Sequence, residues 1–410
     1  MKTVSKSLIL LAVLASLLSF VKFNHCRDVG WGAPDVYVHA CYSDITALYS
    51  DRGMDKHVFP YSSATNAVEY PVITGLVMWG TSYLVSDEKN PYRDYFDINI
   101  ALLVLLFIGL VITIFKINPE FAYLLPVAPA VIASLFINWD LWAVITAALS
   151  IYFYKKEKPD LSALFLGISI VTKFFPIVFL FPILLISIKC GRLKNFLRYF
   201  AITVITWLAI NLPIALTNYQ GWSRFYKMNF TRTADWGSIW YGITALGGKV
   251  SALNYLSILI TLILIAALAI FYIDISETRT HHQNLTLMIF LTMAAFTSVN
   301  KVYSPQYILW LTPFAVLAMT IKKERSAFWI WQGAELIYHF AIWQYFAGFL
   351  GGKFGLPENW YALTIFIRIA ALLYFCLTLA RTALAARSTT QRLSRGSLLE
   401  FLSKATDGYA

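Results

Sequence analysis

Apolar residues along the chain fall into long runs separated by short polar stretches. The runs lack the period-two alternation that is typical of membrane barrels. A bilayer core of about 30 Å takes about 20 apolar residues per helical crossing, and backbone groups in lipid must bond within their own segment. The pattern therefore predicts an all-α polytopic membrane protein. The runs cover residues 7–23, 97–115, 121–138, 140–154, 161–188, 195–217, 253–273, 284–299, 306–321, 326–349 and 361–381.

Two segments decide how many times the chain crosses the membrane and in which direction. The run 161–188 is too long for one crossing, and Lys173-Phe174-Phe175-Pro176 interrupts it. Since proline has no backbone N–H to donate, we expect two short helices that meet at a bend. The segment 69–85 begins at Glu69-Tyr70-Pro71 and contains two glycines. If it lies in the outer interface, about 12 crossings (11–13) result; if it crosses, the next four spans invert.

Composition and charge favour the interfacial alternative. Of the 410 residues, 59% are hydrophobic and 13% charged, so the apolar excess must face lipid. With 69–85 in the interface, the basic clusters share one side, which the positive-inside rule makes the cytoplasmic side of the plasma membrane. The net charge of +11 is then an orientation signal, and nucleic-acid binding is excluded. These clusters are residues 155–158, 189–198, 322–325 and 381–395.

The predicted organisation has one membrane domain and one tail. Residues 1–381 form the transmembrane domain, in which residues 24–96 are the first extracytoplasmic loop, with juxtamembrane helices and an interfacial helix at 69–85. Residues 382–410 form a basic cytoplasmic tail, so both termini are cytoplasmic. The N-terminal run has basic residues before an apolar stretch, as a secretory signal does, but no small-x-small cleavage site follows it, which favours an uncleaved first helix.

The cysteines and histidines predict little metal chemistry. Cys26 and Cys41 share the first loop and can pair if that loop is extracytoplasmic. The chain has no CxxC and no His-rich zinc spacing, so no metal site is predicted.

Unusual polar sequences gather on the predicted outer face. A carboxylate there can take the proton of an acceptor hydroxyl, cations can hold a leaving phosphate, and Tyr or Trp can cover sugar faces. Such a set is typical of a site for a lipid-linked polar substrate. The candidate site residues are Asp44 and, for donor or acceptor binding, Tyr42, Glu69, Asp140, Lys173, Arg224, Arg232, Lys301 and Gln306, together with His339 and Arg368 inside late spans.

The order of several short motifs carries a family resemblance over roughly residues 35–315. Tyr42-Ser43-Asp44-Ile45, Arg52-Gly53, Pro60-Tyr61 and Glu69-Tyr70-Pro71 resemble the first extracytoplasmic loop of the family 87 glycosyltransferases. This is the actinobacterial group of polyprenol-phosphate-mannose-dependent mannosyltransferases, with GT-C architecture. The later motifs that are similar to the family are Gly167 to Pro176, Asn211-Leu212-Pro213, Gly221-Trp222 and Asn300 to Tyr307.

The resemblance implies an inverting transferase that is metal-independent or weakly metal-dependent, with no certain cofactor. It would move mannose from a β-linked polyprenyl phosphate to a glycolipid or glycan outside the membrane, forming an α-mannoside. The implied partners are the lipid-linked donor, the acceptor and membrane lipids. The acidic residue of the first loop is the family's general base, a role that falls on Asp44. Glu-Tyr-Pro in place of the family's Tyr-Pro-Pro leaves the donor sugar and the acceptor open.

Each candidate also has a structural explanation. Asp44 and Asp140 suit helix N-caps, Glu69 suits a helix dipole, and Lys173 can extend toward the interface. Arg224 and Arg232 can bind phosphate or meet lipid headgroups. Glu335 and His339 are four residues apart on one helical face, and Arg368 lies at a depth comparable to His339 in the next span. These residues form either a buried structural pair or a donor-phosphate pocket.

Three other functions compete with mannosyl transfer. A transporter or flippase of a lipid-linked saccharide places its polar residues near the midplane, with short outer loops, whereas this chain concentrates them at one face. A polyprenyl-phosphate-arabinose-dependent transferase and a non-catalytic partner in envelope synthesis remain the further alternatives.

Overall fold

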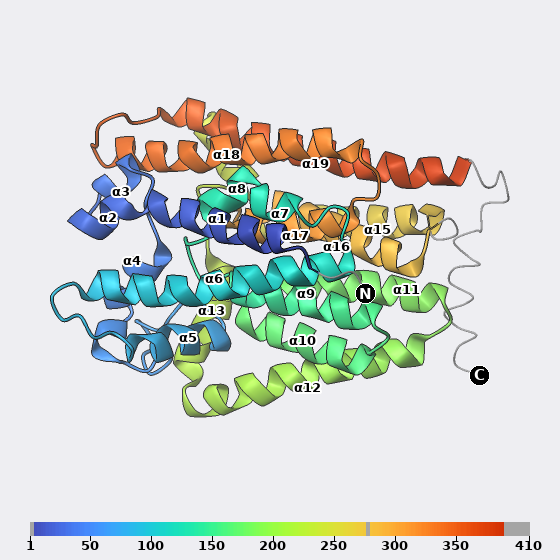
Figure 1. Cartoon of the computed structure of the whole chain (residues 1–410), viewed down its shortest axis with the longest axis horizontal. Coiled ribbons are helices and arrows are strands. Elements are labelled where there is room, and N and C mark those ends of the chain that lie inside the picture. Colours follow the sequence, from blue (N-terminus) through green and yellow to red (C-terminus); the bar gives the residue numbers. More distant parts are fainter. Residues whose placement is uncertain (1–3, 276–278, 389–410) are drawn as a thin grey trace.

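The structure, a computed structural model, describes residues 4–275 and 279–388, and all regular structure within them is helical (Figure 1). Most of the longer helices lie roughly along one axis (Figure 1). Those of ten or more residues are α1 (Lys6–Lys22), α5 (Val72–Ser82), α6 (Pro91–Ile117), α9 (Leu141–Lys155), α10 (Pro159–Thr172), α11 (Leu180–Lys189), α12 (Leu193–Thr217), α13 (Tyr219–Thr231), α15 (Leu253–Ile275), α16 (His281–Val299), α17 (Ile308–Ala318), α18 (Glu324–Phe349) and α19 (Glu358–Ser388).

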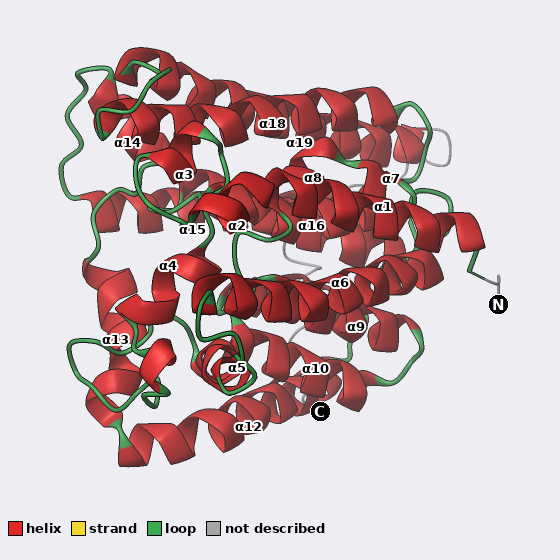
Figure 2. Ribbon diagram, turned by 60° about the vertical axis from the view of Figure 1, so that its left-hand side comes forward, coloured by secondary structure: helices red, strands yellow, loops and turns green. Residues whose placement is uncertain are grey.

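Shorter helices connect these elements and gather near the ends and breaks of the long ones. They are α2 (Asn24–Val29), α3 (Asp35–Val38), α4 (Asp44–Asp51), η1 (Met54–Lys56), α7 (Leu124–Val127), α8 (Pro129–Ser134), η2 (Phe175–Phe179), α14 (Ile239–Ala245) and η3 (Pro305–Tyr307). Figure 2 shows α3, α4, α13 and α14 together at one end of the bundle.

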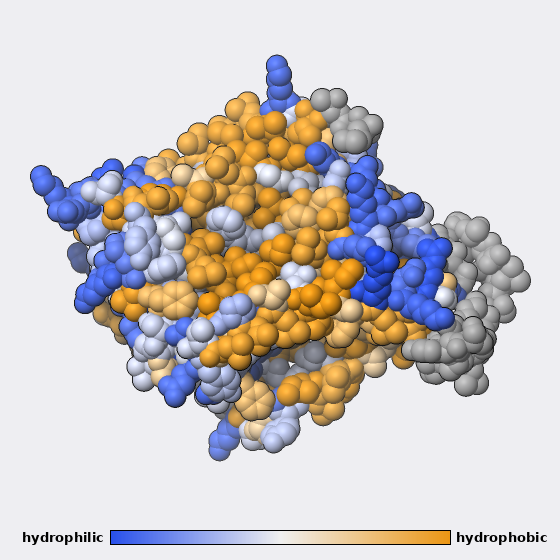
Figure 3. Space-filling view, turned by 90° about the horizontal axis from the view of Figure 1, so that it is seen from below, coloured by the Kyte–Doolittle hydropathy of each residue, from blue (hydrophilic) through white to orange (hydrophobic). Residues whose placement is uncertain are grey.

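The chain is a multi-pass membrane protein. Four described helices are long and apolar enough to cross a bilayer: α6, α12, α15 and Glu358–Ala385 of α19. On α15, Leu259, Leu262 and Ile263 are each more than half exposed, as expected for side chains that face lipid. Figure 3 shows a hydrophobic belt between two hydrophilic ends. The total of about 12 crossings remains a prediction.

The run 121–138 is not the single helix that its apolar composition suggests. It contains α7 and α8, followed by a turn that leads to Asp140. Ala128 separates the two helices with φ −70° and ψ 115°, because a residue that precedes a proline, here Pro129, is pushed out of the helical region. Because of this break, the segment can place Asp140 in the interior of the helix bundle.

The run 161–188 breaks where its sequence predicts. Lys173, at the end of α10, has extended backbone with φ −152° and ψ 129°. Pro176 then falls within the first turn of η2, where its missing N–H costs nothing. The helix ends at Lys173, and the Lys173 side chain can therefore reach a neighbouring element.

The first loop begins and ends at the same end of the bundle. Nη2 of Arg27, after α1, lies 2.6 Å from Oδ2 of Asp97, near the start of α6. Between them, α5 has 11 residues, about 16 Å of helix. Cys26 and Cys41 form a disulfide within this loop. The position of residues 69–85 relative to a membrane remains a prediction.

The opposite end of the bundle carries the basic clusters that lie within the described residues. Nζ of Lys155, at the end of α9, donates to the Ile117 carbonyl at the end of α6 over 2.6 Å. The start of α1 and the end of α19 lie at this end too (Figure 1). Of the predicted tail 382–410, residues 382–388 continue α19, and 389–410 lie outside the described residues.

Candidate active site

Asp44 is the first residue of α4, and two backbone carbonyls hold it in place. The hydroxyl of Ser43 caps the helix by accepting from the Ile45 N–H and donates to the Phe136 carbonyl over 2.9 Å. The Asp44 N–H donates to the Ile137 carbonyl over 2.7 Å. Because Ser43 supplies the cap, the Asp44 carboxylate is free for another role.

Two tyrosines hold that carboxylate. The Tyr42 hydroxyl donates to Oδ1 and the Tyr70 hydroxyl to Oδ2, each over 2.9 Å. Burial raises the pKa of Asp44 above its ordinary value, although both tyrosine hydrogen bonds and the charge of Lys173 oppose the shift. A carboxylate has about four lone-pair positions, so Asp44 can still accept a proton from a third hydroxyl.

An aromatic wall supports Tyr42. Its ring centroid lies 5.5 Å from that of Tyr37 and 5.2 Å from that of Trp343. Tyr37 belongs to α3 and Trp343 to α18, so the first loop and a late helix together position one donor to Asp44. Half-buried Tyr42 and Tyr37 offer flat apolar surface of the kind that suits a sugar ring.

A buried ion pair adjoins Tyr70. Nζ of Lys173 lies 2.8 Å from Oδ1 of Asp140, whose side chain is almost fully buried, and Nε1 of Trp310 donates to Oδ2 over 2.6 Å. The same Nζ lies 4.4 Å from the ring centroid of Tyr70, within the range of a cation–π interaction. Tyr70 therefore contacts both Asp44 and Lys173.

Trp310 is fixed by stacking on both sides. Its ring centroid lies 4.0 Å from that of Phe175, in η2, and 3.8 Å from that of Tyr307, in η3. Gln306 precedes Tyr307 and is half-buried. The two short 3-10 helices thus form a rigid support under the Asp140 carboxylate.

Glu69 holds two arginines. Arg52 pairs with it through Nε and Nη2, and Nη2 of Arg224 lies 3.2 Å from Oε1. Burial alone would raise the pKa of Glu69, but the hydrogen bonds and charge of Arg52, with the charge of Arg224, outweigh it and leave the pKa below its ordinary value. Glu69 therefore ties α13 to the first loop, next to Tyr70.

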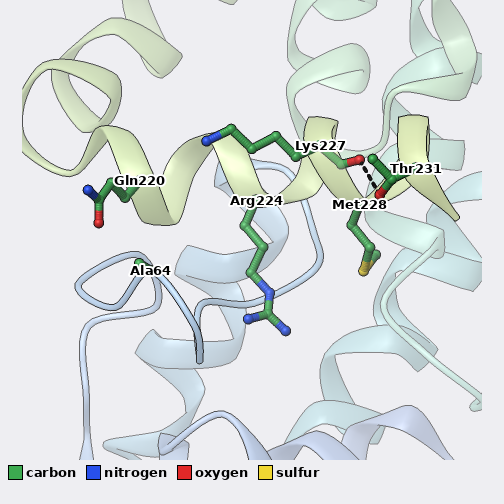
Figure 4. A pocket seen from close by; sticks show the side chains of 6 residues that line it. All are labelled: Ala64, Gln220, Arg224, Lys227, Met228 and Thr231. Carbon is green, nitrogen blue, oxygen red and sulfur yellow. Dashed lines mark hydrogen bonds between the residues drawn. The ribbon is translucent and has the colours of Figure 1, made fainter.

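Arg224 also lines an open pocket of about 380 Å³ between α13 and the first loop. In Figure 4, Arg224 points from α13 toward the loop that carries Ala64, and Lys227 lies along the same helix. Two cations beside this pocket favour an anionic ligand, and Nε of Arg224 is buried without a partner among the described residues.

Arg232 and Lys301 both pair with protein groups near the loop between α13 and α14. Nη2 of Arg232 lies 3.2 Å from Oδ1 of Asp235, and burial raises the pKa of Asp235 above its ordinary value. Nζ of Lys301 donates to the Phe230 carbonyl over 2.9 Å and to Oδ1 of Asn254 over 2.7 Å. Lys301 thereby joins the end of α13 to the start of α15.

His339 and Arg368 belong to different clusters. Nε2 of His339 lies 3.3 Å from Nζ of Lys22, and its Nδ1 lies 3.2 Å from the Ser134 hydroxyl. Nη1 of Arg368 lies 3.7 Å from Oε2 of Glu335, and Arg368 donates to the Gly237 and Tyr303 carbonyls. The structural explanation of Glu335 and Arg368 as a buried pair fits these contacts.

The structure thus brings Tyr42, Asp44, Asp140 and Lys173 into one connected group through Tyr70, and joins Glu69 to Arg224 beside it. It gives Arg232, Lys301, His339 and Arg368 protein partners elsewhere. Sequence analysis missed Tyr70, Arg52 and Trp310 as site residues. Tyr70 and Arg52 stood within the family-like motifs, whereas nothing local distinguishes Trp310 from other tryptophans.

Comparison with known proteins gives three similarities. The sequence model of glycosyltransferase family 87 matches residues 70–299, more than half of the chain, a range that includes Tyr70, Asp140 and Lys173 and begins after Asp44. GPI mannosyltransferase 1 of Kluyveromyces lactis is 28% identical over 197 residues, covering 44% of this chain. The chain spans about half of that relative, with 49% of it covered.

A solved structure with a similar course of the chain is ArnT from Cupriavidus metallidurans bound to undecaprenyl phosphate. The match covers 99% of this chain and 88% of that chain, with a TM-score of 0.48 and 12% sequence identity. A similarity at this level says nothing about the chemistry of the site.

Proposed function

The chain belongs to glycosyltransferase family 87, and from this premise we propose that it transfers mannose from a polyprenyl-phosphate donor to an extracytoplasmic glycolipid or glycan. The proposed product is an α-mannoside formed with inversion, and the proposed general base is Asp44. The architecture is proposed to be of the GT-C type, with the active site on the outer face of the plasma membrane.

The observation that carries this proposal is the environment of the Asp44 carboxylate. Asp44 is half-buried. Two tyrosine hydroxyls orient its carboxylate, each over 2.9 Å, and burial raises its pKa. A general base works best when its pKa approaches the pH at which it operates, and partial burial leaves one side open to an acceptor hydroxyl.

The proposed reaction is a single displacement. The oxygen of the acceptor hydroxyl attacks the anomeric carbon as the bond from that carbon to the phosphate oxygen breaks. The proton of the hydroxyl passes to Asp44, and the electron pair leaves with polyprenyl phosphate. Attack on the face opposite the phosphate inverts a β-linkage to an α-linkage.

Lys173 is the proposed partner of the leaving phosphate. An ammonium offers three hydrogen bonds, and Asp140 is the one hydrogen-bond acceptor within 3 Å that the described residues give it. Its position over Tyr70 sets a positive charge beside the proposed base, where negative charge develops on the phosphate. Arg224, at the pocket of Figure 4, is the proposed contact for the anionic part of the donor or acceptor.

Mannose is the proposed sugar because a relative over 197 residues is named a mannosyltransferase. The test is transfer by the purified protein in vesicles that contain a membrane extract as acceptor source. We expect label from polyprenyl-phosphate mannose to enter a glycolipid or glycan, and label from polyprenyl-phosphate arabinose not to do so. Translocation of intact donor without transfer would identify a flippase instead, and arabinose transfer would correct the donor.

The acceptor and the orientation need separate measurements. Comparison of glycolipids and glycans from deletion and wild-type cells identifies the acceptor as the product that the deletion strain lacks. Single cysteines at Asp87 and Lys156, both exposed, report the orientation. An impermeant thiol reagent added to intact cells should label position 87 and leave position 156 unlabelled.

A further inference from the structure

A second polar cluster lies in the first loop, outside the group around Asp44. Nε2 of His25 lies 2.6 Å from Oδ2 of Asp35, and Nε2 of His39 lies 3.5 Å from Oδ1 of the same carboxylate. The two imidazole rings are stacked with centroids 3.5 Å apart. One ligand atom from each of the three residues falls within 4.8 Å of the other two.

Covalent and helical geometry hold the cluster together. His25 directly precedes Cys26, and His39 stands two residues before Cys41, the disulfide partner of Cys26. Both cysteines are fully buried. Asp35 and His39 are four residues apart, at the start and just past the end of α3, and therefore project from one side of it.

We propose that His25, Asp35 and His39 bind a divalent transition-metal ion of the zinc class. Two imidazole nitrogens and a carboxylate oxygen are ligands that zinc takes, with a fourth position left for water. Ligand atoms around tetrahedral zinc are about 3.4 Å apart, which the Asp35–His39 distance of 3.5 Å already meets. The 2.6 Å contact of His25 is with the other carboxylate oxygen, Oδ2, so the His25 side chain has to move to meet the same metal ion.

The side chains can make that adjustment. Their exposed fractions are 36% for His25, 45% for Asp35 and 44% for His39, so solvent and ions reach all three, and their outer atoms are not locked by packing. The metal replaces the protons that otherwise join each imidazole to the carboxylate, so its binding releases protons.

The metal ion would hold α3 in place and would take no part in the sugar transfer. Nε2 of Gln344, in α18, donates to the Val38 carbonyl over 3.2 Å, and Tyr37 stacks on Tyr42, which donates to Asp44. Fixing both ends of α3 thus fixes one support of that tyrosine. The inference does not depend on the proposed transfer, since the cluster contains none of its residues.

Calorimetric titration of tag-free, EDTA-treated, non-reduced protein with ZnCl₂ tests the site. We expect saturable binding of one ion by wild type, a rise in Tm with zinc, and binding at least about 100-fold weaker in Asp35→Asn and in His39→Gln. X-ray absorption of the zinc complex should show two imidazoles per metal ion. Equal zinc affinity in wild type and both variants, or absorption without two imidazoles, would overturn the proposal.

Two control variants separate this cluster from other sites. His57→Gln removes a histidine of the same loop that stacks on Tyr83, away from the cluster, and should bind zinc as wild type does. Cys190→Ser removes a thiol that lies 3.6 Å from the His281 imidazole and should also leave the affinity unchanged. If Cys190→Ser abolishes the binding, the zinc belongs to that thiol and the proposal is wrong. Retention of the Cys26–Cys41 disulfide, measured by mass spectrometry, shows that Asp35→Asn and His39→Gln fold.

Discussion

Nζ of Lys173 and Oδ1 of Asp140 form an ion pair of 2.8 Å in the interior of the helix bundle. Each residue stands at a break in helical structure, Lys173 after α10 and Asp140 before α9. Taken alone, Asp140 resembles a helix cap and Lys173 a side chain that extends to the interface. Their pairing, with the Tyr70 ring 4.4 Å from the ammonium, joins them to the surroundings of Asp44.

Lys173→Met is expected to abolish measurable transfer, because it removes the cation proposed to meet the leaving phosphate. It also leaves the Asp140 carboxylate, with 1% side-chain exposure, without its counter-charge. Breaking such a buried pair costs about 3–5 kcal/mol, so the Tm should fall as well. Transfer assays and thermal denaturation in detergent measure the two effects.

The double variant Lys173→Met/Asp140→Asn separates chemistry from folding. It removes both charges, so we expect the Tm to recover most of the loss while transfer remains absent. Recovery of transfer together with the Tm would show that Lys173 acts only through stability.

Tyr70→Phe should move the acid limb of transfer to higher pH. The Tyr70 hydrogen bond lowers the pKa of Asp44, so its loss raises that pKa further, and the base becomes protonated at a higher pH. The pH dependence of kcat/KM measures the shift. Tyr92→Phe is the matched control, because its hydroxyl bonds to Ser50, and it should keep the wild-type profile. If the acid limb of Tyr70→Phe stays at the wild-type pH, Asp44 is not the group whose titration limits transfer.

The sequence predicted the helical class and singled out Asp44, Asp140 and Lys173 as candidates, because single charges in apolar surroundings are visible one residue at a time. It did not predict the pairing of Asp140 with Lys173, since that depends on two breaks 33 residues apart in the chain coming together. The interruption of 121–138 was visible only in its prolines, which the overall apolarity of the run concealed.

The sequence also did not predict which groups the charged side chains contact. His339 faces Lys22, from the first helix, and Lys301 reaches a carbonyl and an amide instead of a carboxylate. Side-chain type gives the charge of a residue, but packing of elements remote in sequence decides what neutralises it. For the same reason the short separation of His25, Asp35 and His39 does not resemble a familiar metal motif, although a disulfide and one helical turn bring them together.

Glu69→Gln is expected to lower the Tm at neutral pH by a few degrees, because it removes the charge that holds Arg52 and Arg224. The pKa of Glu69 lies below its ordinary value of 4.5, so this stabilisation is present above pH 4.5 and is lost as pH falls through the lower, folded-state pKa. The difference in Tm between wild type and variant should therefore shrink in acid. The control Glu88→Gln, at an exposed position, should match wild type throughout, and a Glu69→Gln protein as stable as wild type at pH 7 would contradict the pairing.

Arg368→Met should greatly reduce the amount of folded protein. Arg368 is fully buried between the rings of Tyr303 and Tyr338, and its loss leaves Glu335 buried without a cation. Arg368→Met/Glu335→Leu should recover folded protein, because replacing both members of a buried pair by apolar residues is often neutral. Size-exclusion profiles measure folded yield. A well-folded Arg368→Met enzyme with only a raised KM for the donor would favour the donor-phosphate pocket instead.

The most direct test of the proposed mechanism is the rate of mannosyl transfer by Asp44→Asn in membranes supplied with polyprenyl-phosphate mannose. Burial raises the pKa of Asp44, so the ionised carboxylate disfavours folding above that pKa, and asparagine should fold at least as well at neutral pH. We predict a loss of at least about 100-fold in rate at normal protein abundance, with Asp51→Asn, at the exposed end of the same helix, near the wild-type rate. An Asp44→Asn protein that transfers mannose at the wild-type rate would contradict the assignment of Asp44 as the base.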